Sequence, residues 1–271
     1  MSKHFPKQDT AYHKDPRQYD RTRGLPDGVQ EAIVAHLLAK IGVGDAMLDL
    51  GAGSGRFAIP LAERGARVFA ADLSAEMLRH LLGKCAQKSA CPLLVQADAM
   101  RLPFRSAAFG SAFSVHTLHL VENLTTAIKE IERVLKNGGI FALGYIEHEA
   151  DSPIGWVLEN WRRALAERGY DLSRPMWRRH SQIVAALRQK FGPPHIVIAA
   201  QWQGIISPAE ALRSAAERLF TPYWGLPDEE HVAIIAELER AATEFFGNLN
   251  APLQDTRRFV WHFFEIHRRE A

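Results

Sequence analysis

The feature that most constrains this chain is a glycine-rich turn between a short apolar run and a helical stretch. Residues 46–50 read Ala-Met-Leu-Asp-Leu, residues 51–55 read Gly-Ala-Gly-Ser-Gly, and a helical pattern runs from about Ser54 to Arg64. Glycines let the backbone turn sharply and let a ligand approach, while the first turn of the helix presents unpaired N–H groups. The pattern predicts a strand, a nucleotide-binding turn and a helix.

The spacing of these glycines separates two kinds of nucleotide site. The dinucleotide fingerprint is Gly-x-Gly-x-x-Gly. Here the third glycine, Gly55, comes one residue early, and Arg56 stands in the place expected for it. The spacing therefore weighs against an NAD-dependent oxidoreductase.

Apolar runs and helical patterns alternate through the first half of the chain. Strands are expected at 46–50, 67–71, 92–96, 108–115 and 140–146, with helices at 27–41, at 54–64, after Ser74 and at 123–136. Parallel strands need long crossovers, so this alternation predicts a parallel sheet with helices on both faces.

The pattern changes after Ala150. Helices are expected near 153–168, 178–191, 208–219 and 228–246, and two late strands near 195–202 and 257–267. We expect the late strands to form a hairpin-like pair at the sheet edge, with residues 204–254 inserted between them. The predicted fold class is α/β, a doubly wound, Rossmann-like, mostly parallel seven-stranded sheet with helices on both faces and a helical cap inserted before the last strand.

The length of 271 residues suits one large domain or two small ones, and the distribution of motifs favours one. Residues 1–25 are polar without clear periodicity and are expected to form an N-terminal arm or lid. Residues 26–147 form the predicted α/β core. Residues 148–271 complete the sheet and carry the cap within the same domain.

Composition narrows the choice of partners and compartment. The formal net charge of +2 gives no strong field for nucleic acid or an anionic membrane. The two cysteines, Cys85 and Cys91, match no zinc spacing and are expected to be reduced thiols. No signal-peptide pattern or membrane-spanning apolar run is visible, so we expect a soluble cytoplasmic protein that binds neither nucleic acid nor membrane.

Two acidic residues stand where strands of the predicted sheet end. Asp72 follows Gly51 by 21 residues and ends the second strand, and Asp98 closely follows the third. Open α/β sheets bind ligands at the carboxyl ends of their strands, where a carboxylate after the second strand can hold both hydroxyls of a ribose.

Four ordered motifs resemble the class I S-adenosylmethionine-dependent methyltransferases, and within them the small-molecule group related to ubiquinone and menaquinone biosynthesis methyltransferases. The motifs lie at Leu48–Gly55, Ala71–Leu78, Gln96–Phe104 and Glu130–Gly139, and the resemblance covers residues 45–147. It implies S-adenosylmethionine as the cofactor and a small-molecule substrate as the methyl acceptor.

The resemblance implies roles for residues of the turn and of the fourth strand. Gly51, Ala52 and Gly53 would lie against the methionine and ribose part of the cofactor. Asp49 would orient the turn or the methionine ammonium, and Ser114 would approach the sulfonium.

The resemblance also implies an adenosine site. Asp72 would hold the ribose hydroxyls, Leu73 and Met77 would pack on the adenine, and Asp98 with the Ala99 amide would read the adenine edge.

Many relatives fold an N-terminal segment over the cofactor, so Tyr19 and Arg23 are expected to touch its methionine end.

The sequence departs from the family pattern at Gly110, where an Asp usually opens the fourth strand, and at Asn137, where a Pro usually precedes Gly-Gly. Both positions are structural.

Methyl transfer needs alignment more than acid–base chemistry, because the sulfonium is already a reactive electrophile. Holding the reactants for in-line displacement supplies on the order of 7–11 kcal/mol. For a hydroxyl or an acidic carbon a base would help, and the catalytic candidates are His116, His119 and Tyr145, after the fourth strand and near the end of the fifth. The acidic and histidine residues of 147–151 lack metal-ligand spacing, so no metal is expected.

Several alternatives stay open. Some relatives transfer a modified methyl group with the same cofactor, and a methyltransferase-like domain without catalysis would serve as an interaction module. The methylated atom is O, N or C. An exposed apolar face on the cap helices would support a homodimer.

Overall fold

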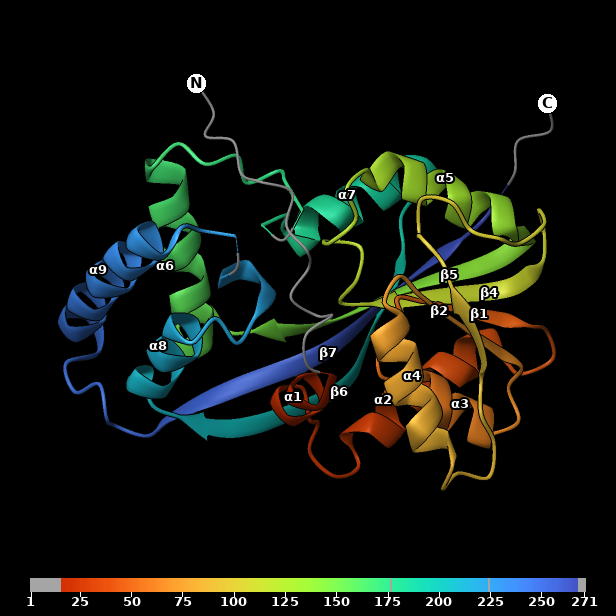
Figure 1. Ribbon diagram of the computed structural model, residues 1–271, viewed down its shortest axis with the longest axis horizontal. Coiled ribbons are helices and arrows are strands. Elements are labelled where there is room, and N and C mark those ends of the chain that lie inside the picture. Colours follow the sequence, from red (N-terminus) through yellow and green to blue (C-terminus); the bar gives the residue numbers. More distant parts are fainter. Residues whose placement is uncertain (1–15, 176, 224, 268–271) are drawn as a thin grey trace. The chain divides into compact units, whose positions relative to one another are not determined.

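Figure 1 shows the computed structural model, which describes residues 16–175, 177–223 and 225–267. Its strands are β1 (Met47–Leu50), β2 (Val68–Asp72), β3 (Leu93–Gln96), β4 (Phe109–Val115), β5 (Leu135–His148), β6 (His195–Ile206) and β7 (Leu253–Glu265). Within the described residues they form one seven-stranded sheet in the order β3-β2-β1-β4-β5-β7-β6. The predicted fold class is confirmed, and the two late strands are neighbours at the sheet edge.

The strand order places a ligand-binding edge beside β1. β2 and β4 both pair with β1 in parallel, so that Asp49 lies opposite Ala70 on one side and Phe113 on the other. The chain crosses from one side of β1 to the other between β3 and β4. Open α/β sheets bind ligands outside the carboxyl ends of their strands at such a reversal, and the glycine turn follows β1 there.

The chain divides into two compact units, and the divisions fall within β5, β6 and β7 or in the loop before α7 (His180–Phe191). Of the described residues, the sheet unit contains 16–145, 180–200 and 259–267. The cap unit contains 146–179 and 201–258, apart from residues 176 and 224. The predicted boundaries at 25 and 147, and the assignment of both parts to one domain, stay predictions.

Helices lie on both faces of the sheet unit. Besides α7, they are α1 (Pro16–Thr22), α2 (Val29–Ile41), α3 (Ala58–Glu63), α4 (Ala75–Cys85) and α5 (Leu124–Val134). α5 and α7 cover one face, and α2, α3 and α4 lie on the other (Figure 1). Ile128 and Ile131 of α5 recur at helical spacing and are buried in a core shared with Leu187 of α7 and Phe141 of β5.

The cap unit has its own core among the helices α6 (Pro153–Glu167), α8 (Pro208–Ala216), α9 (Asp228–Phe246) and the 3₁₀ helix η2 (Thr221–Tyr223). Trp161 of α6 is fully buried there, and its indole N–H donates to the Pro222 carbonyl at 2.9 Å. Because α6 precedes β6 in the chain, the cap is larger than the 204–254 insertion that the sequence predicts.

Two segments differ from the sequence-based expectation. Residues 16–22 of the expected arm form α1. Polar contacts hold this helix in place, so its sequence has no apolar periodicity that would have predicted it. β5 begins at Leu135, although the sequence predicts a helix to 136. Gly138 donates to the Ile266 carbonyl and Ile266 donates to the Gly139 carbonyl, at 2.9 and 2.8 Å, so the segment pairs with the end of β7.

The expectation of two reduced cysteines is wrong for this structure. Cys85, the last residue of α4, forms a disulfide with Cys91, and their Cα atoms lie 5.5 Å apart. The expectation rested on how cysteines are used in different compartments. The loop between α4 and β3 instead brings the two side chains together.

Among the helices of the described residues, none combines the length and the apolar character that crossing a bilayer requires. The cytoplasmic location stays a prediction.

Candidate functional site

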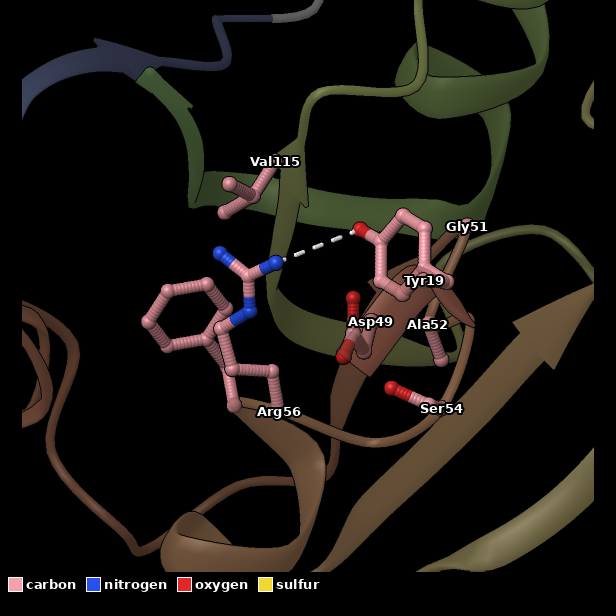
Figure 2. A pocket seen from close by; sticks show the side chains of 8 residues that line it. Tyr19, Asp49, Gly51, Ala52, Ser54, Arg56 and Val115 are labelled. Atoms are coloured by element: carbon pink, nitrogen blue, oxygen red, sulfur yellow. Dashed lines mark hydrogen bonds between the residues drawn. The ribbon is translucent and has the colours of Figure 1, made fainter. Parts of the chain in front are cut away.

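A pocket opens at the carboxyl end of β1, within the sheet unit. The space at its mouth and inside it amounts to about 290 Å³, open solvent included, and Figure 2 shows the side chains around it. Its walls come from α1, β1, the glycine turn and the end of β4, and they are lined by Tyr19, Asp49, Gly51, Ala52, Ser54, Arg56, Phe57 and Val115. Of the predicted cofactor residues, Tyr19, Asp49, Gly51 and Ala52 therefore surround one space.

Backbone hydrogen bonds hold the glycine turn against β2. The N–H groups of Gly51 and Ala52 both donate to the Ala71 carbonyl, at 2.8 and 3.0 Å. Gly51 has a φ of +81°, and a Cβ there would overlap the Thr117 side chain. Gly53 has a φ of +54°, but nothing lies within 4 Å of the position that its Cβ would take. Gly51 is thus needed for folding, whereas Gly53 leaves space for a ligand against the backbone.

Two carboxyl groups, those of Asp49 and Asp72, lie at this turn. Asp72 accepts from the N–H of Gly53 at 2.7 Å and from the N–H of Ser74 at 2.8 Å, one on each oxygen. An ionised carboxylate has about four acceptor sites, so a carboxylate at this place can accept from a ligand hydroxyl as well as from backbone N–H groups. Asp49 is only 3% exposed, and its burial, together with the charge of Asp72, raises its pKa well above the usual range. A cation bound in the pocket would offset both effects.

Arginine and tyrosine side chains form another wall of the pocket. Arg56 Nη2 donates to the Tyr19 hydroxyl at 3.5 Å (Figure 2). The guanidinium carbons of Arg56 and Arg23 lie 5.6 and 5.5 Å from the centroid of the Tyr19 ring. Two guanidinium groups beside one ring are suited to bind an anionic group of a ligand. Sequence reasoning did not place Arg56 in the site, although its position in the glycine motif was the available signal.

A polar contact fixes α1 beside the pocket. Asp20 accepts from the Ser54 hydroxyl of the glycine turn, and its other oxygen contacts His80 Nε2 and Lys84 Nζ of α4, at 2.9 and 3.0 Å. Burial by itself would raise the pKa of Asp20, but the hydrogen bonds from Ser54, His80 and Lys84 lower it overall. Sequence reasoning missed Asp20, whose only signal was its place next to Tyr19.

The predicted adenosine residues lie after β2 and β3. Asp98 Oδ1 accepts from the Met100 N–H at 2.8 Å, which orients the carboxylate beside the half-buried Ala99. Leu73 is 58% exposed, whereas Met77 in the first turn of α4 is 3% exposed. Leu73 is therefore open to a ligand. The contacts of all these residues with adenine stay predictions.

The residues predicted near the sulfonium lie at the end of β4. Ser114 is fully buried, and its hydroxyl donates to the Leu50 carbonyl at 2.9 Å, which ties β4 to β1. His116 has a φ of +52°, a conformation that non-glycine residues seldom adopt and that recurs at functional sites. Burial lowers the pKa of His116 well below its usual range, and the positive charge of Arg56 acts in the same direction. His119 lies in the turn that follows β4, and Tyr145 lies in β5.

The sheet order reverses beside β1, where the glycine turn lies, and acidic residues stand in β1, at the end of β2 and after β3. Doubly wound sheets bind their ligands at such a reversal. Residues 48–143 match the family described as methyltransferase domain. This match lies within the stretch that carries the four motifs, and the resemblance to methyltransferases drawn from them is confirmed.

Named relatives agree with this assignment. The chain is 35% identical over 138 residues to the malonyl-[acyl-carrier protein] O-methyltransferase of Geobacter sulfurreducens. The aligned residues cover 49% of this chain and 50% of the relative. It is 32% identical over 123 residues to the demethylmenaquinone methyltransferase of Thermobifida fusca, which covers 43% and 51%. The chain thus spans about half the length of the curated relatives it matches.

The fold is also similar to that of a solved structure, the phosphoethanolamine N-methyltransferase 2 of Haemonchus contortus in complex with S-adenosyl-L-methionine. The TM-score is 0.53 at 19% identity, and the match covers 96% of this chain and 59% of that one.

Proposed function

We propose that this protein transfers a methyl group from S-adenosylmethionine to a small-molecule acceptor. The observation that carries the proposal is the pocket after β1, where a buried carboxyl group, an arginine and the glycine turn face one space. The methionine end of S-adenosylmethionine carries a positive ammonium, a positive sulfonium and a negative carboxylate. The pocket offers groups of complementary sign to these charges.

Each group has a role that its surroundings favour. Asp49 would bind the ammonium, because a cation compensates for the burial of its carboxylate. Arg56, with Arg23 on the Tyr19 ring, would bind the carboxylate. Asp72 would accept from the ribose hydroxyls, and the empty space at Gly53 would receive the ribose.

The chain's own contribution to the reaction would be alignment. The cofactor, when bound, supplies a methyl group on a positively charged sulfur. The residues around the pocket would hold it beside the acceptor for in-line displacement, which contributes on the order of 7–11 kcal/mol. The docked α1 would keep water from the methionine end. His116, His119 and Tyr145 stay candidates for contact with the acceptor.

The comparisons support a small or carrier-bound acceptor. By their names, the two curated relatives methylate malonyl-acyl carrier protein and demethylmenaquinone, and the solved neighbour holds S-adenosylmethionine. The nearly balanced charge of this chain favours such acceptors over nucleic acid. We further propose that the protein acts in the cytoplasm.

Calorimetry with S-adenosylmethionine and with NAD tests the cofactor. We expect heat of binding with the first and none with the second, and the absence of binding to S-adenosylmethionine would refute the proposal. Formation of S-adenosylhomocysteine in a metabolite pool would distinguish an enzyme from a non-catalytic interaction domain. Removal of residues 1–24, which include α1, should weaken binding of the cofactor.

A further inference from the structure

Beyond the cofactor pocket, the sheet unit gathers imidazole rings and a phenol ring that the proposed cofactor contacts do not use. The group comprises His116 and His119 after β4, Tyr145 in β5, His180 at the start of α7 and His262 in β7. The ring of Tyr145 lies 3.4 Å, between centroids, from that of His180, and 5.4 Å from that of His262, with which it is stacked. We call these five residues the imidazole cluster.

The imidazole cluster adjoins the cofactor pocket through the end of β4. Val115 lines the pocket, and His116 is the next residue of the chain. The charge of Arg56, another lining residue, acts on His116, as do His119 and His180. The cluster therefore stands where a methyl acceptor would meet the methionine end of the cofactor.

His180 contains a polar atom that the fold does not use. Its Nε2 is buried, and among the described residues it has no hydrogen-bond partner. A buried polar atom without a partner destabilises the folded state, so folded proteins seldom retain one without a reason. A ligand group that exchanges a hydrogen bond with Nε2 would remove this cost.

The electrostatic surroundings indicate which ligand group fits. Burial lowers the pKa of His180 well below its usual range, and the neighbouring His119 and His262 act in the same direction. The groups that act on His116 and His180 are arginines and histidines, and within the described chain no carboxylate is among them. His180 also begins α7, whose first turn has no acidic residue and whose N-terminal dipole favours negative charge. These surroundings disfavour a cationic amine and favour an oxyanion.

We propose that the acceptor is a compound with an acidic hydroxyl group, namely a phenol, an enol or a carboxylic acid, and that its oxygen is bound by Nε2 of His180. This inference rests on the proposed methyl transfer. An ionised acceptor accepts a hydrogen bond from Nε2–H, and its oxygen forms the bond to the methyl carbon as the carbon–sulfur bond breaks. A neutral acceptor instead donates its proton to Nε2, and the imidazolium then releases the proton to solvent. Because the imidazole is a weak base here, only an acidic hydroxyl transfers its proton readily.

Metal assistance is not part of this proposal. In the portion of the chain that the structure describes, no three His, Cys, Asp or Glu side chains are arranged to hold a metal ion.

The test uses 4-nitrophenol as an acidic probe and benzylamine as a cationic probe, each titrated into the full chain with and without S-adenosylhomocysteine. Visible absorption reports whether bound 4-nitrophenol is ionised, and calorimetry reports affinity. His180→Phe keeps a ring against Tyr145 but removes Nε2. His36→Phe makes the same change at an exposed position of α2 and serves as the matched control.

We expect 4-nitrophenol to bind as the phenolate and benzylamine not to bind. His180→Phe should raise the Kd of 4-nitrophenol at least about tenfold, because the variant loses a hydrogen bond to a charged group. The affinity for S-adenosylhomocysteine should be unchanged in both variants. The inference is overturned if 4-nitrophenol does not bind, if benzylamine binds as tightly, or if His180→Phe binds the phenol like the unmodified protein. Failure of S-adenosylhomocysteine to bind would instead contradict the proposed function, and the titrations without it still decide the role of His180.

Discussion

At the scale of single residues, Asp49 illustrates a conflict between stability and binding. Its carboxyl group is buried next to the charge of Asp72, and both the burial and that charge destabilise its ionised form. We predict that Asp49→Asn raises the Tm of the ligand-free protein at neutral pH. The same change should weaken S-adenosylmethionine binding about 10- to 100-fold, because a charged hydrogen bond of about 1.5–3 kcal/mol is lost. A lower Tm without ligand, measured by calorimetry, would contradict the first part.

The same residue predicts a pH dependence. The pKa of Asp49 in the folded protein lies well above the ordinary aspartate value of 3.8, so the folded state holds this proton more tightly than the unfolded state. The stability that the protonated Asp49 contributes is therefore fully present below the ordinary pKa of aspartate, and it is lost as the pH rises through the pKa of Asp49 in the folded protein. The Tm difference between Asp49→Asn and the unmodified protein should grow over this window and then level off. A difference that is constant with pH would argue against the assignment.

Two glycines of the turn provide a matched pair of substitutions. In Gly51→Ala the new Cβ overlaps the Thr117 side chain, and the φ of +81° is strained for alanine. Overpacking costs about 1–3 kcal/mol and the backbone strain about 1–2 kcal/mol, so the variant should be destabilised by several kcal/mol. Gly53→Ala meets no atom, so only the strain applies. We expect Gly53→Ala to fold but to bind S-adenosylmethionine poorly. Denaturant unfolding and calorimetry check both, and equal unfolding free energies would contradict the argument.

At the scale of elements, α1 depends on the rest of the sheet unit. It has 7 residues, too few for a stable isolated helix, and Asp20 connects it to Ser54, His80 and Lys84. We predict that Asp20→Asn increases hydrogen exchange in α1 and weakens S-adenosylmethionine binding severalfold. Asp27→Asn, an exposed position after α1, is the control and should change neither. Unchanged exchange in Asp20→Asn would show that other contacts hold the helix.

The elements differ in how far the sequence predicted them. Helix α4 was expected because Ser74 provides a cap and the apolar residues recur at helical spacing, and Ser74 does accept from the Met77 N–H. The start of β5 was missed because Leu135 pairs with Phe109 of β4, and Gly138 and Gly139 hydrogen-bond with Ile266, which is distant in sequence. Local capping and periodicity are visible in a sequence, whereas such pairing partners are not.

At the scale of the whole molecule, the two units can be tested separately. Trp161 is fully buried in the cap unit, and Trp161→Ala should cost about 3–5 kcal/mol of unfolding free energy there. All residues that line the cofactor pocket belong to the sheet unit, so S-adenosylhomocysteine affinity should stay within about twofold under conditions where the variant is folded. Val232→Ala, at a position of α9 that is 65% exposed, is the control. A large loss of affinity in Trp161→Ala alone would show that the units are energetically coupled.

The sequence by itself determined the alternating sheet, the glycine turn after β1, the acid at the end of β2 and the acid after β3. These features follow from periodicity, turn chemistry and spacing, which act over a few residues or repeat in order along the chain. Only the tertiary structure decided that Asp20 docks α1, that Arg56 faces Tyr19, that Cys85 pairs with Cys91, and that His180 meets Tyr145. Those contacts depend on where separate elements meet, and no local pattern of side chains specifies such a meeting.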